Sequence, residues 1–274
     1  MFLKKFGLGA GLFAMGLTPW GLALAASQPW QTGFQPAASP VMENIEDFHR
    51  FLLYITVAIC ILVLALLAWI VIRYNQRRNP VPGMVTHNTV LEVIWTIVPV
   101  VILVVIAIPS FKLLYFEADI PPPDLTIKAI GKQWFWTYQY PTNGNFQFDS
   151  LGLSDVNASK KGEPRLLGVD NVVVVPVNKV VRIVTTGADV IHSWAVPAFG
   201  VKMDAVPGHL NETWFKAERE GTYYGQCSEL CGARHAFMPI EVKVVSQDAF
   251  NAWIQTAKKK FASSGGSRVA DLAK

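Results

Sequence analysis

The feature that most constrains this chain is a pair of long apolar runs in its first half. Phe51–Ile72 carries no charged residue over about 22 positions, which is enough for a helix to span a bilayer. Val90–Leu114 is of similar length and carries only two charged residues, Glu92 and Lys112. Charged residues make up 16% of the whole chain, against about 25% in soluble domains. The sequence therefore predicts a transmembrane helical hairpin over residues 48–116, with spans at about 51–72 and 90–114.

Charge is distributed unevenly around these runs. Arg73, Arg77 and Arg78 lie between them, and acidic residues lie on the outer flanks. The positive-inside rule then places the loop in the cytoplasm and both ends outside, on the periplasmic side of a bacterial inner membrane. Eight of the 24 Lys and Arg residues lie in the leader, this loop and the tail, which leaves 16 basic groups against 20 acidic ones. This balance argues against nucleic acid as a partner.

The N-terminal residues have the pattern of a secretory signal peptide. Lys4 and Lys5 precede an apolar run, and small residues end it, which predicts a signal over residues 1–25 with cleavage after Ala25. The alternative is a retained membrane helix, which Pro19 and the many glycines disfavour. Residues 26–47 show no periodicity and are predicted to be an exposed segment.

Residues 117–247 change to short β-type runs. Apolar residues alternate from Leu125, Gly131 shifts the phase, and the alternation resumes, so that a bulge is predicted at Gly131 and Trp134 and Trp136 are predicted to share one face of a strand. Further runs lie at 172–177, 180–185, 213–217 and 241–245. About 120 residues of such strands predict a β-sandwich or a Greek-key barrel. Residues 248–274 are predicted to form a helix over 248–261 and then a tail.

The stretch from Cys227 to Met238 holds soft metal ligands in the order Cys-x3-Cys-x3-His-x2-Met, and His192 lies upstream. Thiolate and thioether sulfur favour copper. A single-copper electron-transfer site uses one Cys, so the second Cys supplies ligands for two coppers bridged by two thiolates. Zinc is an alternative for a Cys2His2 set, but it has no use for Met238. A disulfide between Cys227 and Cys231 is another alternative, and it leaves the His and Met residues unexplained.

The run from Gln226 to Gly232, with His235 and Met238, resembles the copper A loop of the cytochrome c oxidase subunit II family. The resemblance extends over roughly residues 40–250 and implies two transmembrane helices followed by an all-β cupredoxin-like Greek-key barrel. It also implies two copper ions with these ligands: His192, Cys227, Glu229 through its backbone carbonyl, Cys231, His235 and Met238. The Glu229 carboxylate is further implied to help bind a magnesium ion shared with the catalytic subunit.

The same resemblance implies that the chain is the electron-entry subunit of a respiratory haem-copper oxidase that reduces oxygen to water and pumps protons. Its implied partners are cytochrome c, the haem-bearing subunit I, subunit III and membrane lipid. Trp134 is implied to receive the electron, and Glu92 to lie at the entrance of a proton-uptake path. Asp170 and Asp189 are predicted to steer a basic cytochrome c by long-range attraction. A copper-free quinol oxidase subunit II and a membrane-tethered copper carrier remain as alternatives.

Overall fold

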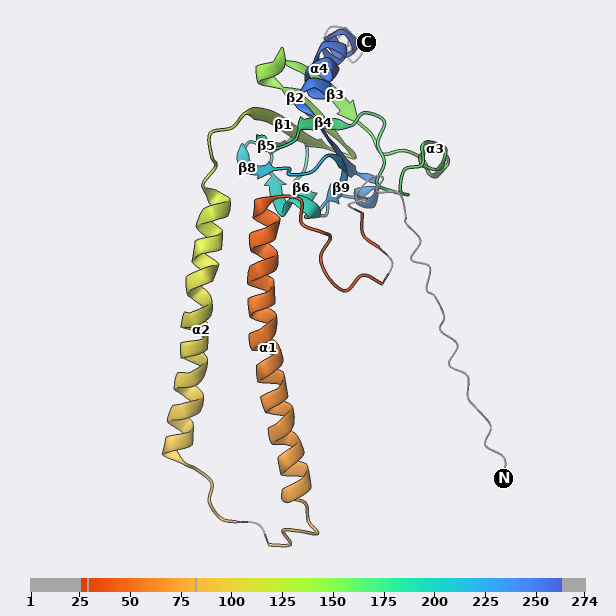
Figure 1. Ribbon diagram of the computed structural model, residues 1–274. Helices are drawn as coiled ribbons and strands as arrows, with labels where there is room; N and C mark the ends of the chain where they lie inside the picture. The colour runs from red at the N-terminus through yellow and green to blue at the C-terminus, as the bar shows by residue number, and fades with distance from the viewer. Residues whose placement is uncertain (1–25, 29, 82, 263–274) are drawn as a thin grey trace, which may run out of the picture.

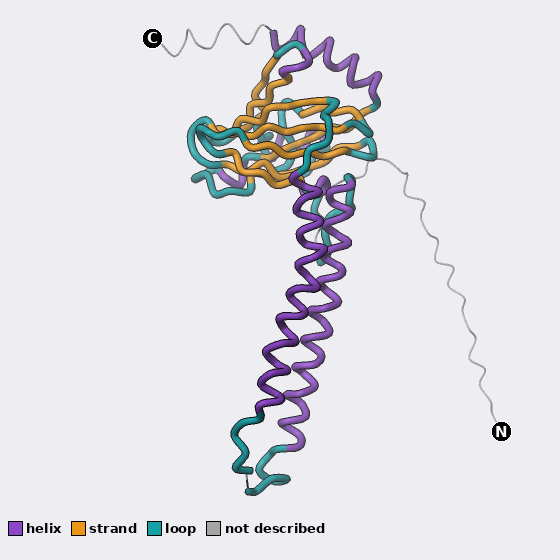
Figure 2. Tube along the Cα trace, turned by 90° about the vertical axis from the view of Figure 1, so that its left-hand side faces the viewer, coloured by secondary structure: helices purple, strands orange, loops and turns teal. Residues whose placement is uncertain are grey.

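The chain has a stalk of two helices and a β-domain at one end of it (Figure 1). It is described here from a computed structural model that covers residues 26–28, 30–81 and 83–262. A view turned by 90° shows one helix in front of the other, with the strands of the β-domain above them (Figure 2). The predicted signal peptide, 1–25, and the end of the predicted tail, 263–274, lie outside the described residues.

The stalk consists of α1 (Pro40–Arg73) and α2 (Thr89–Ala118). Ser39 begins α1 by accepting a hydrogen bond from the Met42 N–H, and Asn88 does the same for the first N–H groups of α2. Both helices are long and apolar enough to cross a membrane, and their apolar windows are not buried within the chain. The predicted helical hairpin is therefore present.

The first helix begins earlier than the apolar run. α1 starts at Pro40, so the predicted exposed segment 26–47 ends at Ser39, and Val41 and Met42 are buried against the β-domain. The Ser39 hydroxyl donates to the carbonyl of Phe199 over 2.7 Å, and the Ala38 N–H donates to the carbonyl of Ala198 over 2.9 Å. Apolarity marks only the part of a helix that lies in lipid, whereas this first turn is fixed by the protein.

Two five-stranded sheets face each other in the β-domain. One has the order β3-β2-β1-β5-β8 and the other β4-β10-β9-β6-β7. The strands of the first sheet are β1 (Leu125–Lys132), β2 (Phe135–Tyr140), β3 (Phe146–Ser150), β5 (Val180–Gly187) and β8 (Asn211–Lys216). Those of the second are β4 (Val173–Pro176), β6 (His192–Val196), β7 (Val201–Ala205), β9 (Gly221–Cys227) and β10 (Pro239–Val245). The fold class of two helices followed by a β-sandwich is confirmed.

Two sheet pairings are parallel, β1 with β5 and β4 with β10, while the others are antiparallel. The predicted runs at 172–177, 180–185, 213–217 and 241–245 correspond to β4, β5, β8 and β10. The predicted C-terminal helix is α4 (Gln247–Ala262), which packs on the open edge near β3 (Figure 1). A short helix, α3 (Asp155–Lys161), lies in the connection before β4.

Aromatic side chains fill the space between the sheets. The largest fully buried ones are Trp136, Trp194, Tyr138, Tyr140, Tyr223, Phe199 and Phe215. Phe199 and Phe215 stack with ring centroids 4.3 Å apart, an arrangement that adds to the stabilisation from burial alone. This packed core fixes the ends of the strands from which the loops at the end of the sandwich begin.

The strand predicted through Trp134 and Trp136 is wrong in one respect. Lys132 pairs directly with Phe135, so Gln133 and Trp134 form a two-residue turn between β1 and β2. The change of phase comes from this turn, and β1 continues through Gly131 without a bulge. Trp134 and Trp136 therefore do not share a strand face. A two-residue reversal and a bulge both shift a period-2 pattern by one position, so the sequence pattern does not separate them.

Candidate metal centre

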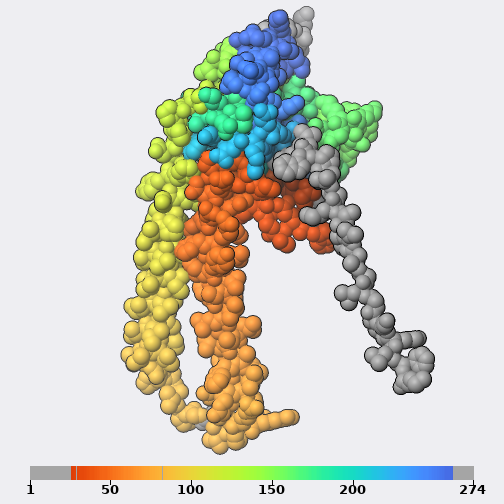
Figure 3. Space-filling view, in the orientation of Figure 1, coloured from red at the N-terminus to blue at the C-terminus, as the bar shows by residue number. Residues whose placement is uncertain are grey.

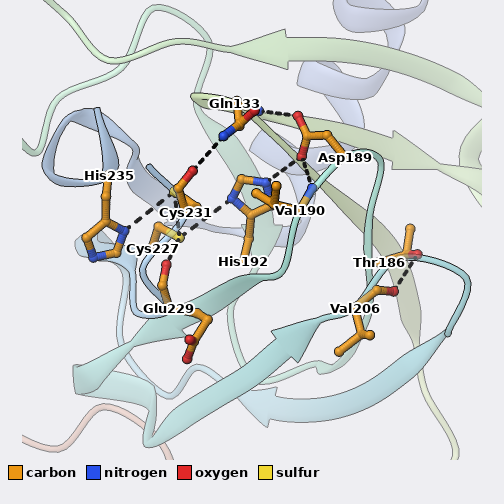
Figure 4. A network of polar contacts seen from close by, with 10 residues as sticks. All are labelled: Gln133, Thr186, Asp189, Val190, His192, Val206, Cys227, Glu229, Cys231 and His235. Carbon is orange, nitrogen blue, oxygen red and sulfur yellow. Dashed lines mark hydrogen bonds and ion pairs between the residues drawn. The ribbon is translucent and has the colours of Figure 1, made fainter. Parts of the chain in front are cut away.

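Two thiols and two imidazoles meet at the end of the sandwich (Figure 4). The Cys227 and Cys231 Sγ atoms lie 3.9 Å apart, and the Cys227 Sγ lies 3.8 Å from the His192 Nδ1. The His235 Nδ1 lies 3.6 Å from the Cys231 Sγ. The ligand atoms of His192, Cys227 and Cys231 all lie within 4.8 Å of one another, close enough to share a metal site.

Neighbouring strands deliver these side chains. His192 is the first residue of β6 and Cys227 the last of β9, and these strands are adjacent in one sheet. The loop that follows carries Cys231 and His235 back to β10, and the Cys227 N–H donates to the Met238 carbonyl over 3.0 Å where it returns. Met238 is fully buried in the same core cluster as both cysteines. The loop is thus fixed at both ends by sheet pairing.

Asp189 orients the His192 ring. The ring Nε2 lies 2.8 Å from the Asp189 Oδ1, which leaves Nδ1 as the nitrogen that faces Cys227. A carboxylate in this position fixes the ring and makes it a stronger ligand. Burial alone would raise the pKa of Asp189, but hydrogen bonds from His192 and from the N–H groups of Gln133 and Val190 lower it below its usual value. Asp189 therefore remains ionised beside the site.

Gln133 is a site residue that the sequence reasoning missed. Its backbone N–H donates to the Asp189 Oδ2 over 2.6 Å, and its side-chain Nε2 donates to the Cys231 carbonyl over 2.8 Å (Figure 4). The turn between β1 and β2 thus holds both the carboxylate behind one imidazole and the loop behind one thiol.

Gly131 is required by close approach to His192. A Cβ added at Gly131 would lie 2.6 Å from the His192 Cδ2, closer than real Cβ atoms come to other heavy atoms. A glycine inside a strand pattern can mark such an approach as well as a bulge. The sequence thus contained the signal, a glycine inside a strand pattern, but the residue that requires it, His192, lies on another strand.

The two thiols differ in acidity. Burial opposes ionisation of Cys227, but His192 and the backbone around the thiol outweigh it and lower its pKa to about 7. Burial and the nearby Cys227 raise the pKa of Cys231. The first thiolate therefore forms readily near neutral pH, while the second needs a cation to compensate its charge. A bound metal supplies that charge.

The donor set fits a soft metal. Cys227 and Cys231 are free thiols, and their Sγ separation of 3.9 Å is far from a disulfide bond of about 2 Å. The Cys227 Sγ also lies 3.4 Å from the Glu229 backbone carbonyl oxygen, so a carbonyl joins the sulfur and nitrogen ligands. A thioether, two thiols and two imidazoles together favour copper over magnesium or calcium.

The remaining predicted residues lie in three places. Trp134 packs against the core beside the metal loop, and a Cβ at Gly232 would lie 3.2 Å from its Cζ2. Asp170 accepts hydrogen bonds from the Leu151 and Asn171 N–H groups, and within the described residues no hydrogen bond joins its carboxylate to a proposed metal ligand. Glu92 lies in the first turn of α2, at the far end of the stalk.

Family models match both parts of the chain. The model of the cytochrome c oxidase subunit II transmembrane domain matches residues 27–113, and that of its periplasmic domain matches residues 125–245. The chain belongs to the cytochrome c oxidase subunit II family. Its second domain is accordingly a periplasmic domain carried by membrane-spanning helices.

Two curated relatives match this chain over most of their length. The chain is 51% identical over 242 residues to a probable cytochrome c oxidase subunit 2 of Rickettsia bellii, covering 88% of this chain and 90% of the relative. It is 48% identical over 247 residues to cytochrome c oxidase subunit 2 of Cereibacter sphaeroides, covering 84% and 82%. A crystal structure of the periplasmic domain of subunit II of cytochrome oxidase of Bradyrhizobium japonicum is 63% identical, covers 52% of this chain and 99% of that one, and gives a TM-score of 0.49.

Family membership makes the chain a copper-binding subunit of an oxidoreductase complex of the haem-copper type. The His and Cys residues that converge in the β-domain are the group of described residues that could hold the metal.

Proposed function

We propose that the chain is the electron-entry subunit of a respiratory oxidase in a bacterial inner membrane and that it holds a two-copper centre. The observation that carries this proposal is the convergence of two thiols, each beside its own imidazole, around one short Sγ–Sγ distance of 3.9 Å. Cys227 and Cys231 would bridge the pair, and His192 and His235 would each bind one copper. Met238 and the Glu229 carbonyl would complete the set.

The protein's part is to keep this geometry unchanged while the charge changes. When bound, the coppers would accept and release one electron at a time. Asp189 and Gln133 hold His192 and the metal loop from one side, and the β9–β10 pairing holds the loop from the other. Positions fixed by packing and by surrounding hydrogen bonds need little rearrangement between two redox states.

Trp134 is the proposed entry point for electrons from cytochrome c. It is partly exposed, packs on the core, and lies beside the metal loop at Gly232. Around the same loop, Leu230 is 79% exposed and Phe237 is 46% exposed. Exposed apolar side chains that gather around one loop form a patch of the kind that another protein covers. Cytochrome c and the haem-bearing subunit I, with subunit III beyond it, are the proposed partners.

The two acids proposed to steer cytochrome c have different surroundings. Asp189 is bound to His192 and Gln133, so its first role is to orient a ligand, although its charge still adds to the local field. Asp170 hydrogen-bonds to backbone N–H groups. Replacing Asp170 should weaken the salt dependence of cytochrome c association and leave the copper spectrum unchanged.

Glu92 and Glu229 have further proposed roles. Glu92 lies in the first turn of α2 beside the basic loop, where an ionisable group at a membrane edge is a candidate for proton uptake. Its carboxylate also interacts favourably with the positive end of the helix, as any acid in a first turn does. The exposed Glu229 carboxylate is free to bind magnesium with subunit I, since hard oxygen ligands suit that ion.

Paramagnetic resonance of the copper-loaded full chain tests the two-copper proposal. One unpaired electron shared by two copper nuclei is expected, with two coppers per chain by metal analysis. Cys227→Ser should abolish the shared signal, because one bridging sulfur cannot hold the pair symmetrically. Cys60→Ser is the matched control, since this exposed thiol lies in α1. A four-line spectrum from one localised copper, or one copper per chain, would refute the proposal.

Co-purification separates the remaining alternatives. An electron-entry subunit should be isolated together with a haem-bearing subunit. A membrane-tethered copper carrier would be isolated alone with exchangeable copper, and a copper-free quinol oxidase subunit would contain no copper despite a haem-bearing partner.

A further inference from the structure

A groove of about 350 Å³ lies between the two helices just below the β-domain. Phe48 and Phe51 of α1 and Phe116 of α2 contribute its apolar walls, and Asn44, Asp47 and Lys112 contribute polar groups. Figure 1 shows the helices converging toward this end of the stalk, and Figure 3 shows them side by side beneath the domain. The groove is separate from the metal centre and is not used by the proposed electron path.

The charged groups of the groove lie at the level where the lipid head groups begin. The uncharged part of α1 starts at Phe51, and about 22 residues at about 1.5 Å each give about 33 Å, close to the thickness of the hydrocarbon core. On α2 the stretch between Glu92 and Lys112 has a comparable length. Asp47 and Lys112 therefore mark the outer boundary of the bilayer. Phe51 lies on the acyl-chain side of this boundary, and Phe116 lies on the other side, where its ring packs against Trp214 of the β-domain.

Lys112 has no partner in the part of the chain that the structure describes. No hydrogen bond or ion pair joins its ammonium group to a described residue. A lysine at the edge of the hydrocarbon region extends its ammonium group into the head-group layer, where phosphate groups are available as anionic partners. Lys112 thus offers a cation to an anionic group entering the groove from the membrane.

The opposite wall offers acceptors. Asp47 forms an exposed ion pair with Arg50 one helical turn away, a contact of small energy that leaves other carboxylate lone pairs free. Asn44 donates its side-chain N–H to the Pro40 carbonyl over 2.7 Å, which leaves its amide oxygen as an acceptor. One wall of the groove therefore presents a cation and the other presents acceptors.

We propose that this groove binds one zwitterionic phospholipid of the phosphatidylethanolamine type from the outer leaflet. The lipid phosphate accepts hydrogen bonds from Lys112, and its primary ammonium donates to Asp47 and Asn44. The acyl chains continue past Phe51 toward the interior of the bilayer. A purely anionic head group satisfies Lys112 but meets repulsion from Asp47, and a quaternary ammonium carries no N–H to donate.

Native mass spectrometry of the full chain in detergent tests this site, with synthetic phosphatidylethanolamine, phosphatidylcholine and phosphatidylglycerol that carry the same acyl chains. One retained phosphatidylethanolamine is expected. Lys112→Gln should weaken retention of phosphatidylethanolamine about tenfold, as expected for the loss of one charge-assisted hydrogen bond. The same variant should also weaken retention of phosphatidylglycerol. Asp47→Asn should remove the preference for phosphatidylethanolamine over phosphatidylcholine without weakening the retention of phosphatidylglycerol.

The matched control is Arg77→Gln, which removes one positive charge at the opposite membrane face. It should leave retention of all three lipids unchanged. A phosphatidylethanolamine with a photoreactive acyl chain should label the peptide that contains Phe51. The proposal is overturned if all three lipids are retained equally, or if Lys112→Gln acts no more strongly than Arg77→Gln. It is also overturned if Lys112 cross-links to another subunit of the isolated oxidase and no lipid is retained.

Discussion

The helical stalk and the β-domain are both rich in apolar residues, but they use them in opposite ways. Within the described residues, α2 has no buried side chain and α1 buries only Val41 and Met42. The β-domain instead places its large aromatic side chains inside, and Trp136, Trp194 and Phe215 are fully buried. A protein interior and a lipid bilayer are both apolar solvents, but only the interior demands a close fit between side chains. The stalk therefore tolerates changes that the domain does not.

A matched pair of truncations tests this difference most strongly. Phe215→Ala should destabilise the β-domain by about 3–5 kcal/mol, because it leaves a cavity beside Phe199. Phe111→Ala should change the stability by less than about 0.5 kcal/mol, since that ring is 57% exposed on α2. Chemical denaturation of the full chain in detergent measures both. Equal losses from the two variants would contradict the contrast between stalk and domain.

A buried acid makes the stability of the β-domain depend on pH. Glu241 is 4% exposed on β10, and its Oε2 accepts a hydrogen bond from the Val169 N–H over 2.9 Å. Burial raises its pKa to about 7, and the nearby Glu163 carboxylate adds to the shift. Tyr224 donates to Glu163 over 2.5 Å, which keeps that acid close to Glu241.

The sign of this effect follows from proton binding. Between pH 4.5, the ordinary pKa of the group, and pH 7, the folded state holds a proton on Glu241 that the unfolded state has lost. Stability therefore falls as the pH rises through this window, by about 3 kcal/mol in total. Glu241→Gln should flatten the difference in unfolding free energy between pH 5 and pH 8, because an amide does not titrate. Glu92→Gln on the stalk is the control and should leave that difference intact.

The β-domain and the stalk also differ in how much space surrounds a glycine. Gly131→Ala should displace His192, destabilise the domain by about 1–3 kcal/mol and lower the copper content, because the new methyl group has no space. Gly83→Ala in the loop of the stalk meets nothing within 4 Å and should change neither quantity. Metal analysis and thermal unfolding of the two variants measure the contrast. Full copper content in Gly131→Ala would show that His192 does not need its present position.

The smallest expected effect concerns the acid behind the ligand. Asp189→Asn should weaken copper affinity about 10–100-fold, since the carboxylate orients and strengthens His192. Asp170→Asn, which alters another exposed acid of the same domain, should leave affinity unchanged. Competition against a copper chelator gives both values. An unchanged affinity in Asp189→Asn would mean that packing alone orients the ring.

Local patterns in the sequence determined much of this protein. Two apolar runs of spanning length are sufficient to predict α1 and α2, because the bilayer imposes a length that any such helix must meet. The spacing of Cys227, Cys231, His235 and Met238 predicts a soft-metal loop, because few other functions use those four groups together. Alternation predicted strand structure from Leu125, β-rich runs predicted four further strands, and helical spacing predicted α4, since all of these patterns are properties of short segments.

Only the tertiary structure decided which residues from other parts of the chain contact these segments. It placed Trp134 in a turn, His192 against Gly131, and Asp189 and Gln133 behind the ligands. Each of these contacts joins positions brought together by packing of separate strands or turns, and Gln133 and Cys231 are 98 residues apart in the chain. Periodicity reports the face on which a side chain lies, but the distance to a partner depends on how both sheets pack, and that is a property of the whole fold.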